Sequence, residues 1–173
     1  MLVQFTEISI HSDLLAEVKA IYLASFPKEE QHPFDWLVEM ARLGKGHFGG
    51  LIQENRVLGI TYYTVDAGIV YIFYFAVDPA IRSQGYGHQM MQAMQEKYQG
   101  CKFMLLIEEI LEDVENKEER IRRKIFYQKN GFEGTDDFVE VLGATFELLH
   151  LKSGHSSMED YRQIKSNFYS DVS

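Results

Sequence analysis

Residues Tyr71 to Tyr98 read YIFYFAVDPAIRSQGYGHQMMQAMQEKY, a strand pattern followed by a short loop and a helix pattern. The apolar and aromatic run that ends at Val77 is typical of a buried strand. Asp78-Pro79 ends this strand, because proline has no N–H for a ladder and restricts the residue before it. The helix that follows is indicated by apolar residues at helical spacing, namely Met90, Met91, Met94 and Tyr98.

The loop between this strand and this helix is Arg82-Ser83-Gln84-Gly85-Tyr86-Gly87. A strand, a glycine-rich loop and a helix start together aim free backbone N–H groups and the positive end of the helix dipole at an anion. Glycine at positions 85 and 87 leaves room for a ligand to approach the backbone. A plain strand-to-helix turn fits the same residues, so the spacing alone leaves both interpretations open.

The pattern formed by Val77, four further residues and Arg82-x-x-Gly85-x-Gly87 resembles the acetyl-coenzyme A signature of the GCN5-related N-acetyltransferase (GNAT) family. The preceding strand, the Asp-Pro pair and the following amphipathic helix are all in place. The resemblance implies an α/β (α+β) protein with the GNAT fold, in which helices flank a mixed, mostly antiparallel central sheet. It also implies acetyl-CoA as the co-substrate and acetyl transfer to a primary amine as the reaction.

The same resemblance assigns the cofactor contacts. Backbone near Phe75, Ala76 and Val77 would bind the pantetheine arm like an added strand and polarise the thioester carbonyl. The pyrophosphate would rest on the loop and the helix start, at Arg82, Ser83, Gln84, Gly85, Tyr86, Gly87 and His88. Arg82 can add positive charge there, and a surface ion pair with Asp78 is the alternative role.

A second hallmark of the family is a helix that carries a tyrosine five residues before Gly-Phe, and Ile125 to Phe132 read IFYQKNGF. The resemblance places this phenol, Tyr127, near the thioester sulfur. A phenol with a pKa of about 10 can donate a proton to a thiolate whose acid has a pKa near 8.5, so Tyr127 suits a general acid. The alternative is a tyrosine that only packs its ring.

Glu108 is the candidate general base, because it ends the strand that splays from the central strand in this fold. Glu108 and Glu109 are neighbours on a strand, so only one of them can point inward. The alternatives are a solvated carboxylate at a strand end and a base role taken by a chain of water molecules.

One position departs from the family pattern. Many relatives have asparagine seven residues before the helix tyrosine, where this chain has Arg120. Arg122 and Arg123 follow, so a basic helix face replaces a neutral contact. These arginines can hold coenzyme phosphates or pair with Glu118 and Glu119, and the second role is favoured.

The order of the remaining elements matches the family over residues 1–152, which are expected to form one acetyltransferase domain. The expected segments are strands at Leu2–Ile10, His47–Gln53, Val57–Val65, Lys102–Glu108, Phe138–Leu142 and Thr145–Leu151, and helices from Ser12 to before Pro27, from Pro33 to Gly44 and over Ile121–Asn130. We expect Ile121, Ile125 and Phe126 to be buried and the loop Pro27–Pro33 to be charged and exposed. Residues 153–173 form a tail with a short helix expected around Tyr161, Ile164 and Phe168.

Composition narrows the class of protein further. The chain has 173 residues, of which 46% are hydrophobic, and this is enough to form one packed domain. Its formal net charge is −9. The negative charge argues against nucleic acid as a partner and suits a cationic amine. Cys101 is the single cysteine, and the six histidines lack metal-ligand spacing, so neither a disulfide framework nor a metal site is expected. No apolar run reaches bilayer length and no leader pattern is present, which favours a soluble, cytoplasmic protein without membrane contact.

Two other functions compete with catalysis. A dinucleotide-binding loop would use Gly85, Gly87 and Glu108, but its third glycine position is Met90 and no further strand–helix–strand units follow. A non-catalytic acetyl-CoA sensor or interaction module is the stronger alternative. The acceptor amine, a small molecule or a peptide, is not specified by the sequence, although its pocket would draw on Phe26–Trp36 and Phe138–Ala144. A homodimer that uses the tail helix is compatible with the sequence.

Overall fold

The computed structural model of the chain describes residues 2–170. In that range the strands are β1 (Val3–Ile8), β2 (His47–Gln53), β3 (Arg56–Asp66), β4 (Ile69–Val77), β5 (Lys102–Glu108), β6 (Phe132–Val141) and β7 (Ala144–Leu151). The helices are α1 (Leu15–Ser25), α2 (Phe34–Arg42), α3 (Tyr86–Lys97), α4 (Lys117–Lys129) and α5 (Met158–Tyr169), with short 3-10 helices η1 (Lys28–Glu30) and η2 (Pro79–Ile81). The strand order is β1-β2-β3-β4-β5-β7-β6. The pairs β1–β2, β2–β3, β5–β7 and β6–β7 are antiparallel, which confirms the predicted mixed α/β class with a mostly antiparallel sheet.

The chain forms two compact units. The first contains the described residues up to Val65 together with Ile72–Gln99, and the second contains Asp66–Tyr71 together with the described residues from Gly100 onward. Most of β4 therefore belongs to the first unit and its first three residues belong to the second.

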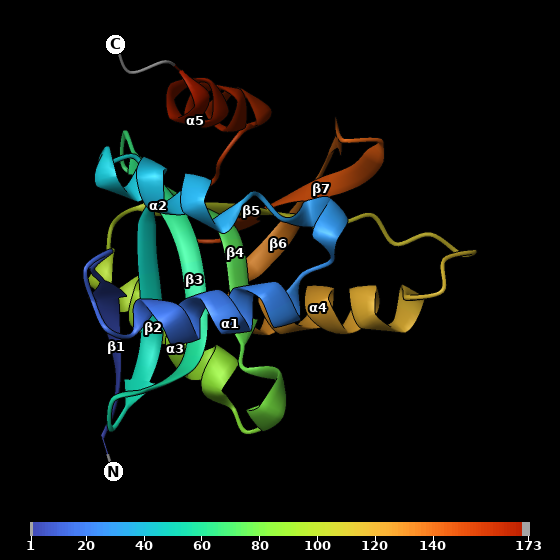
Figure 1. Ribbon diagram of the computed structural model, residues 1–173. Helices are drawn as coiled ribbons and strands as arrows, with labels where there is room; N and C mark the ends of the chain where they lie inside the picture. Colours follow the sequence, from blue (N-terminus) through green and yellow to red (C-terminus); the bar gives the residue numbers. More distant parts are fainter. Residues whose placement is uncertain (1, 171–173) are drawn as a thin grey trace. The chain divides into compact units, whose positions relative to one another are not determined.

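In the first unit, β3 is buried along most of its length because helices cover both of its faces. Tyr62 donates a hydrogen bond from its hydroxyl to the Leu37 carbonyl of α2, 2.8 Å away. Tyr63 points to the opposite face, where its hydroxyl lies 2.7 Å from that of Tyr98 at the end of α3. In Figure 1, α1 and α2 cross in front of β2 and β3.

Tight turns set the strand pairing in this region. Glu54 and Asn55, between β2 and β3, have φ values of 49° and 63°. Ala67 and Gly68, between β3 and β4, have φ values of 51° and 76°. Two consecutive left-handed residues match the natural twist of a hairpin, so the predicted succession of strands here is confirmed.

Helix α3 is anchored where a glycine lies on β3. A Cβ atom at Gly59 would lie 3.1 Å from the Ala76 carbonyl oxygen and 3.3 Å from Met90 Cε. Glycine at this position therefore allows the end of β4 and the first turns of α3 to pack closely on β3. Ile81 and Tyr86, which flank the loop before α3, pack against the same core around Met90.

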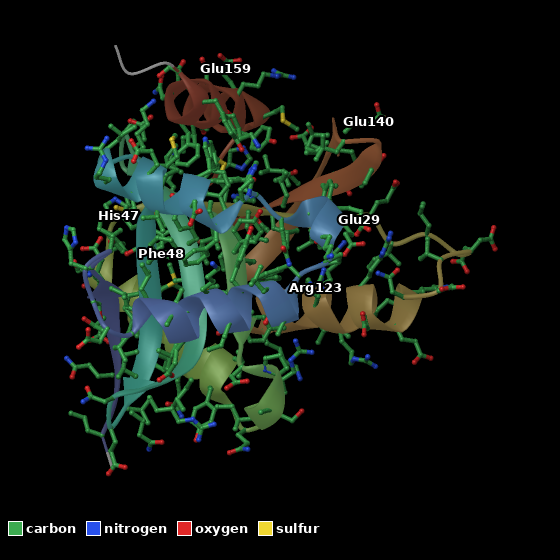
Figure 2. All side chains as sticks on the ribbon, in the orientation of Figure 1. Glu29, His47, Phe48, Arg123, Glu140 and Glu159 are labelled. Carbon is green, nitrogen blue, oxygen red and sulfur yellow. The ribbon has the colours of Figure 1, made fainter. Side chains whose placement is uncertain are left out.

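The loop Pro27–Pro33 was predicted to be charged and exposed, and this is only half right. Lys28 and Glu29 are exposed (Glu29 is labelled in Figure 2), but the second half of the loop is tied down. Tyr74 donates its hydroxyl to the Glu30 carbonyl at 2.6 Å and accepts from the His32 N–H at 3.1 Å. The Tyr22 hydroxyl donates to the His32 carbonyl at 2.7 Å. Buried tyrosines from α1 and β4 thus hold the loop by its main chain.

In the second unit, β6 is longer than the predicted strand Phe138–Leu142 and contains a bulge. The register with β7 shifts between Gly134 and Phe138, and Asp136 adopts a left-handed φ of 61°. The polar run before Phe138 hides this strand from a pattern search, because a bulge breaks the alternation of the two faces. The turn at its end uses Leu142 and Gly143 instead of the expected Gly143-Ala144.

Helix α4 buries a different face from the predicted one. Ile125 is exposed, and Ile121 and Phe126 are only partly buried, whereas Tyr127 and Asn130 are buried. The helix also begins at Lys117, four residues before the expected start. Basic side chains on the inward face of α4 pair with carboxylates on β5 and β7. The spacing of apolar residues in the helix cannot reveal such a polar face.

The predicted helix near the end of the chain is confirmed as α5. Its start is a capping box, in which Ser157 Oγ accepts from the Asp160 N–H while the Asp160 carboxylate accepts from the Ser157 N–H. Tyr161, Ile164 and Phe168 are buried as expected, and Asn167 donates to the Asp66 carboxylate at 2.6 Å.

We expect Ser157→Ala to lower the free energy of unfolding by about 1 kcal/mol, because the N–H of Asp160 loses its acceptor. Urea denaturation measures the change. The matched control is Ser153→Ala, since Ser153 is an exposed turn residue four positions earlier and should leave stability unchanged. Equal stability of the two variants would contradict a structural role for the capping box.

Candidate active site

In the first unit, β4 ends at Val77 and the chain leaves the sheet at a fixed point. The Asp78 N–H donates to the Leu58 carbonyl at 2.9 Å. The Asp78 carboxylate accepts from the Ala80 N–H at 3.0 Å and so caps η2. Asp-Pro therefore acts as predicted, as a strand stop, and it starts a short turn that leads to the loop.

The loop Arg82–Gly85 is exposed and contains two residues with positive φ, Ser83 at 67° and Gly85 at 82°. Gly85 is the N-cap of α3, and a Cβ atom there would meet nothing within 4 Å. Glycine is favoured at position 85 because the backbone there is left-handed, and not because neighbouring atoms would crowd a side chain. The space beside the loop is open to a ligand. Gly87 lies in the first turn of α3.

The start of α3 carries backbone N–H groups that precede its first helical hydrogen bond. The Gln89 N–H is bonded to the Gly85 carbonyl at 3.1 Å, so the N–H groups of Tyr86 and Gly87 come before the first hydrogen bond of the helix ladder. The helix dipole adds positive potential at this end. Such a helix start can bind an anion.

Arg82, at the entrance of the loop, is exposed and has no hydrogen-bond or ion-pair partner among residues 2–170. The predicted alternative, an ion pair between Arg82 and Asp78, is not formed in the structure; Arg56 approaches Asp78 instead, at 4.0 Å. The Arg82 guanidinium therefore remains available to a ligand. The predicted cofactor residues at 75–77 and 82–88 all lie in one continuous segment of the first unit.

In the second unit, Tyr127 lies on α4 and is 7% exposed. Its ring makes edge contacts with Phe126 and Phe132, at centroid distances of 5.2 and 5.7 Å. Burial raises the pKa of the phenol to about 12, and the positive charge of Arg123 opposes this rise. Tyr127 is therefore protonated at neutral pH and has a proton to donate.

Glu108 lies at the end of β5, and its side chain is 12% exposed. Its Oε2 lies 2.8 Å from Arg120 Nη2 and its Oε1 lies 2.9 Å from Arg123 Nη1. Arg120 also donates to the Glu109 carbonyl at 2.7 Å, while its Nε atom is buried without a partner in the described residues. Both carboxylate oxygens of Glu108 already accept from guanidinium groups, so the proposed base also has a structural role.

The predicted partners of the α4 arginines were wrong. Arg120 and Arg123 pair with Glu108 on β5, not with Glu118 and Glu119 on their own helix. Two arginines three residues apart share one side of a helix. Their partner, Glu108, is the last residue of β5, and the spacing of residues in the helix cannot reveal a partner on a strand.

Sequence reasoning also missed a buried carboxylate on β7. Glu147 is 5% exposed and lies 2.9 Å from Lys124 of α4. A Cβ atom at Gly134 would overlap the Glu147 carboxylate, and the Asp136 N–H points to the same group at 3.4 Å. A lone glutamate inside the apolar run of β7 was the available signal. Its place at the bulge of β6 indicates a structural role.

A family model described as an acetyltransferase (GNAT) domain matches residues 44–134, more than half of the chain. The chain belongs to the GNAT family. It is an acetyltransferase of that family, and the match contains both the loop that precedes α3 and the helix that carries Tyr127. A search of curated proteins found no match.

Solved structures of several acetyltransferases have the same fold. A GNAT-family protein from Bacteroides thetaiotaomicron is 23% identical, with 96% of each chain covered and a TM-score of 0.78. A Bacillus subtilis acetyltransferase in complex with CoA is 17% identical, with 87% of this chain and 98% of that chain covered and a TM-score of 0.59. An Elizabethkingia anophelis GNAT acetyltransferase with acetyl-CoA bound is 16% identical, with 86% and 97% covered and a TM-score of 0.60. Within residues 2–170, no helix is both long and apolar enough to span a bilayer.

The raised pKa of Tyr127 predicts a loss of stability in alkali. Because the phenol has a pKa of about 12 in the folded protein and about 10 when unfolded, its contribution is complete below pH 10 and is lost as the pH rises towards 12. At pH 11 the free energy of unfolding has fallen by about 1.4 kcal/mol relative to its value below pH 10. We expect Tyr127→Phe to lose less stability than the parent protein between pH 8 and pH 11 in urea denaturation. An identical pH dependence would contradict the burial of the phenol.

Proposed function

We propose that this protein transfers the acetyl group of acetyl-CoA to a primary amine by direct attack, with Tyr127 as the general acid. The observation that carries the proposal is the loop Arg82–Gly87, which joins an unpaired arginine, a left-handed glycine and the open start of a helix. These three features suit the pyrophosphate of a coenzyme. The family of the chain and the coenzyme bound to two of its structural neighbours support the same ligand.

The donor would be bound in two parts. The pyrophosphate would accept from the N–H groups of Tyr86 and Gly87 and from the Arg82 guanidinium. The pantetheine arm runs along the end of β4, at Phe75, Ala76 and Val77, whose side chains are only partly buried. Backbone N–H groups there polarise the thioester carbonyl and stabilise the oxyanion that forms when the amine attacks.

Tyr127 acts as the sulfur leaves. The neutral amine adds to the carbonyl carbon, the tetrahedral intermediate collapses and the C–S bond breaks. The phenol gives its proton to the sulfur, so that coenzyme A departs as a thiol and not as a thiolate. The phenolate then takes up a proton that originates from the amine, which returns Tyr127 to its protonated form.

Glu108 remains the proposed base, with one complication. The attacking amine must be deprotonated, and a carboxylate can take its proton directly or through water. Glu108 already accepts from Arg120 and Arg123, which favours a role through water or through the helix over direct contact. The two roles differ in their effect on the pH–rate profile.

The acceptor is proposed to be a small amine or a peptide amine, and a cytoplasmic location is expected. The negative net charge of the chain, −9, suits a cationic acceptor. The decisive experiment is the release of free thiol from acetyl-CoA across a broad amine panel. Acetylated product with at least one amine supports the proposal. Tight binding of acetyl-CoA without thiol release for any amine would favour a sensor.

We expect Arg82→Gln to weaken the binding of acetyl-CoA by about five- to twentyfold, because a charge-assisted contact to phosphate is lost. Isothermal titration calorimetry measures the Kd. Arg42→Gln is the control. Arg42 is an exposed arginine on α2 that pairs with Glu39, and its substitution removes the same charge from the protein. Equal losses in both variants would assign the effect to net charge and exclude Arg82 from the site.

We expect Tyr127→Phe to lower kcat by about a hundredfold, the usual contribution of a general acid, with no change in the Kd for acetyl-CoA. Phenylalanine keeps the ring contacts with Phe126 and Phe132, so the fold should persist. Steady-state kinetics with the best acceptor from the panel, together with calorimetry, separate the two effects. A variant with the full turnover rate would remove Tyr127 from the mechanism.

A further inference from the structure

The side of α4 that carries Tyr127 also carries two arginines, Arg120 and Arg123, that have no role in the proposed reaction. Arg120, Arg123 and Tyr127 recur at positions i, i+3 and i+7, and so lie along one side of the helix. Glu108 accepts from both arginines, at 2.8 Å and 2.9 Å. Arg120 is held further by the Glu109 carbonyl. A carboxylate on β5 therefore fixes the turn of α4 that precedes Tyr127.

The other charged groups on this side of the helix are already paired. Lys124 of α4 lies 2.9 Å from Glu147 of β7, and from β6 the Asp136 N–H points to the same carboxylate. Arg120 is 17% exposed and lies two turns before Tyr127, whereas Arg123 lies one turn before it. Lys124 has the Glu147 carboxylate as its partner, whereas Arg120 and Arg123 share the single carboxylate of Glu108 and together keep a net positive charge. Arg123 is therefore the cation best placed to act on the phenol.

A buried phenol is a reluctant acid. Burial holds the proton of Tyr127 more tightly than water would, while the thiol that must receive this proton is a much stronger acid than the phenol. A positive charge one helical turn away favours the phenolate and opposes the effect of burial. Since the Arg123 side chain is 44% exposed, solvent screens part of this effect and its size is moderate.

We propose that Arg123 is a positioning residue for the acetyl transfer: Glu108 holds its guanidinium one turn from Tyr127, where the charge stabilises the phenolate left behind when the proton passes to the sulfur. The inference rests on the proposed role of Tyr127 as the acid. It requires no new reactant, because the proton moves from the phenol oxygen to the sulfur as the C–S bond breaks. Figure 2 labels Arg123 on α4.

The first test measures the acidity of residue 127 without any substrate. A fluorinated tyrosine placed at position 127 titrates at lower pH than tyrosine, within the range where the protein is folded, and its ¹⁹F NMR signal reports the titration. We expect Arg123→Gln to raise the titration midpoint by about 0.5 pH unit, a threefold change in acid strength. Arg123→Lys, which keeps the charge, should restore at least half of the shift.

The matched control is Arg122→Gln. Arg122 is the neighbouring arginine, is exposed and has no partner among the described residues, and its removal changes the net charge by the same amount. We expect it to leave the midpoint unchanged. Equal shifts in Arg122→Gln and Arg123→Gln, or no shift in either, would overturn the inference whether or not the protein turns out to be active.

The second test uses turnover with the best acceptor. We expect Arg123→Gln to lower kcat by about threefold with an unchanged KM for acetyl-CoA, and to have no further effect in the Tyr127→Phe background. An equal effect in both backgrounds would show that Arg123 does not act through Tyr127. If no amine is turned over, the proposed function fails while the NMR result still stands.

Glu108→Gln, with Glu109→Gln as its control, separates the two roles of Glu108. A positioning role predicts that kcat falls by the same factor at every pH and falls no further in the Arg123→Gln variant. Loss of the acidic limb of the pH–rate profile would instead assign Glu108 as the base and overturn its positioning role.

Discussion

The first unit depends on the close packing of Met90 against Gly59. Because no side chain lies between them, the start of α3 and the end of β4 can share one small patch of β3. The loop between them is then held at both ends while its middle stays exposed. A helix start becomes an anion site only if its N–H groups face open space at a fixed place. Here a contact in the core supplies that rigidity, so the loop itself needs no internal bonding network.

In the second unit, carboxylates on strands hold the helix that carries Tyr127. Glu108 and Glu147, from β5 and β7, pair with arginines and a lysine on the inward face of α4. Buried ion pairs contribute little net stability compared with apolar packing, but an unpaired partner is costly. Such pairing therefore specifies the orientation of α4 more than it stabilises the fold. The apolar residue Ile125 on the same helix is left exposed.

Much of the fold and of the loop Arg82–Gly87 was predictable because the signals that specify them are local. Asp78-Pro79, Gly85 and the Gly131-Phe132 stop each act within a few residues, and each has the predicted place in the structure. The face of α4 was not predictable, because its partners lie on strands that are distant in sequence. The bulge at Asp136 and the attachment of the loop near Glu30 were missed for the same reason, since each depends on a side chain from another element.

The attachment of the Pro27–Pro33 loop also sets limits on how this protein can change. The hydroxyl groups of Tyr22 and Tyr74 form hydrogen bonds with main-chain groups of Glu30 and His32. Every residue has those carbonyl groups, and every residue except proline has the N–H, so the amino acids of the loop can be exchanged without loss of the anchors. Inserting or deleting one residue would misplace all three bonds at once. Evolution or a designer can therefore vary the side chains of this loop while its length stays fixed.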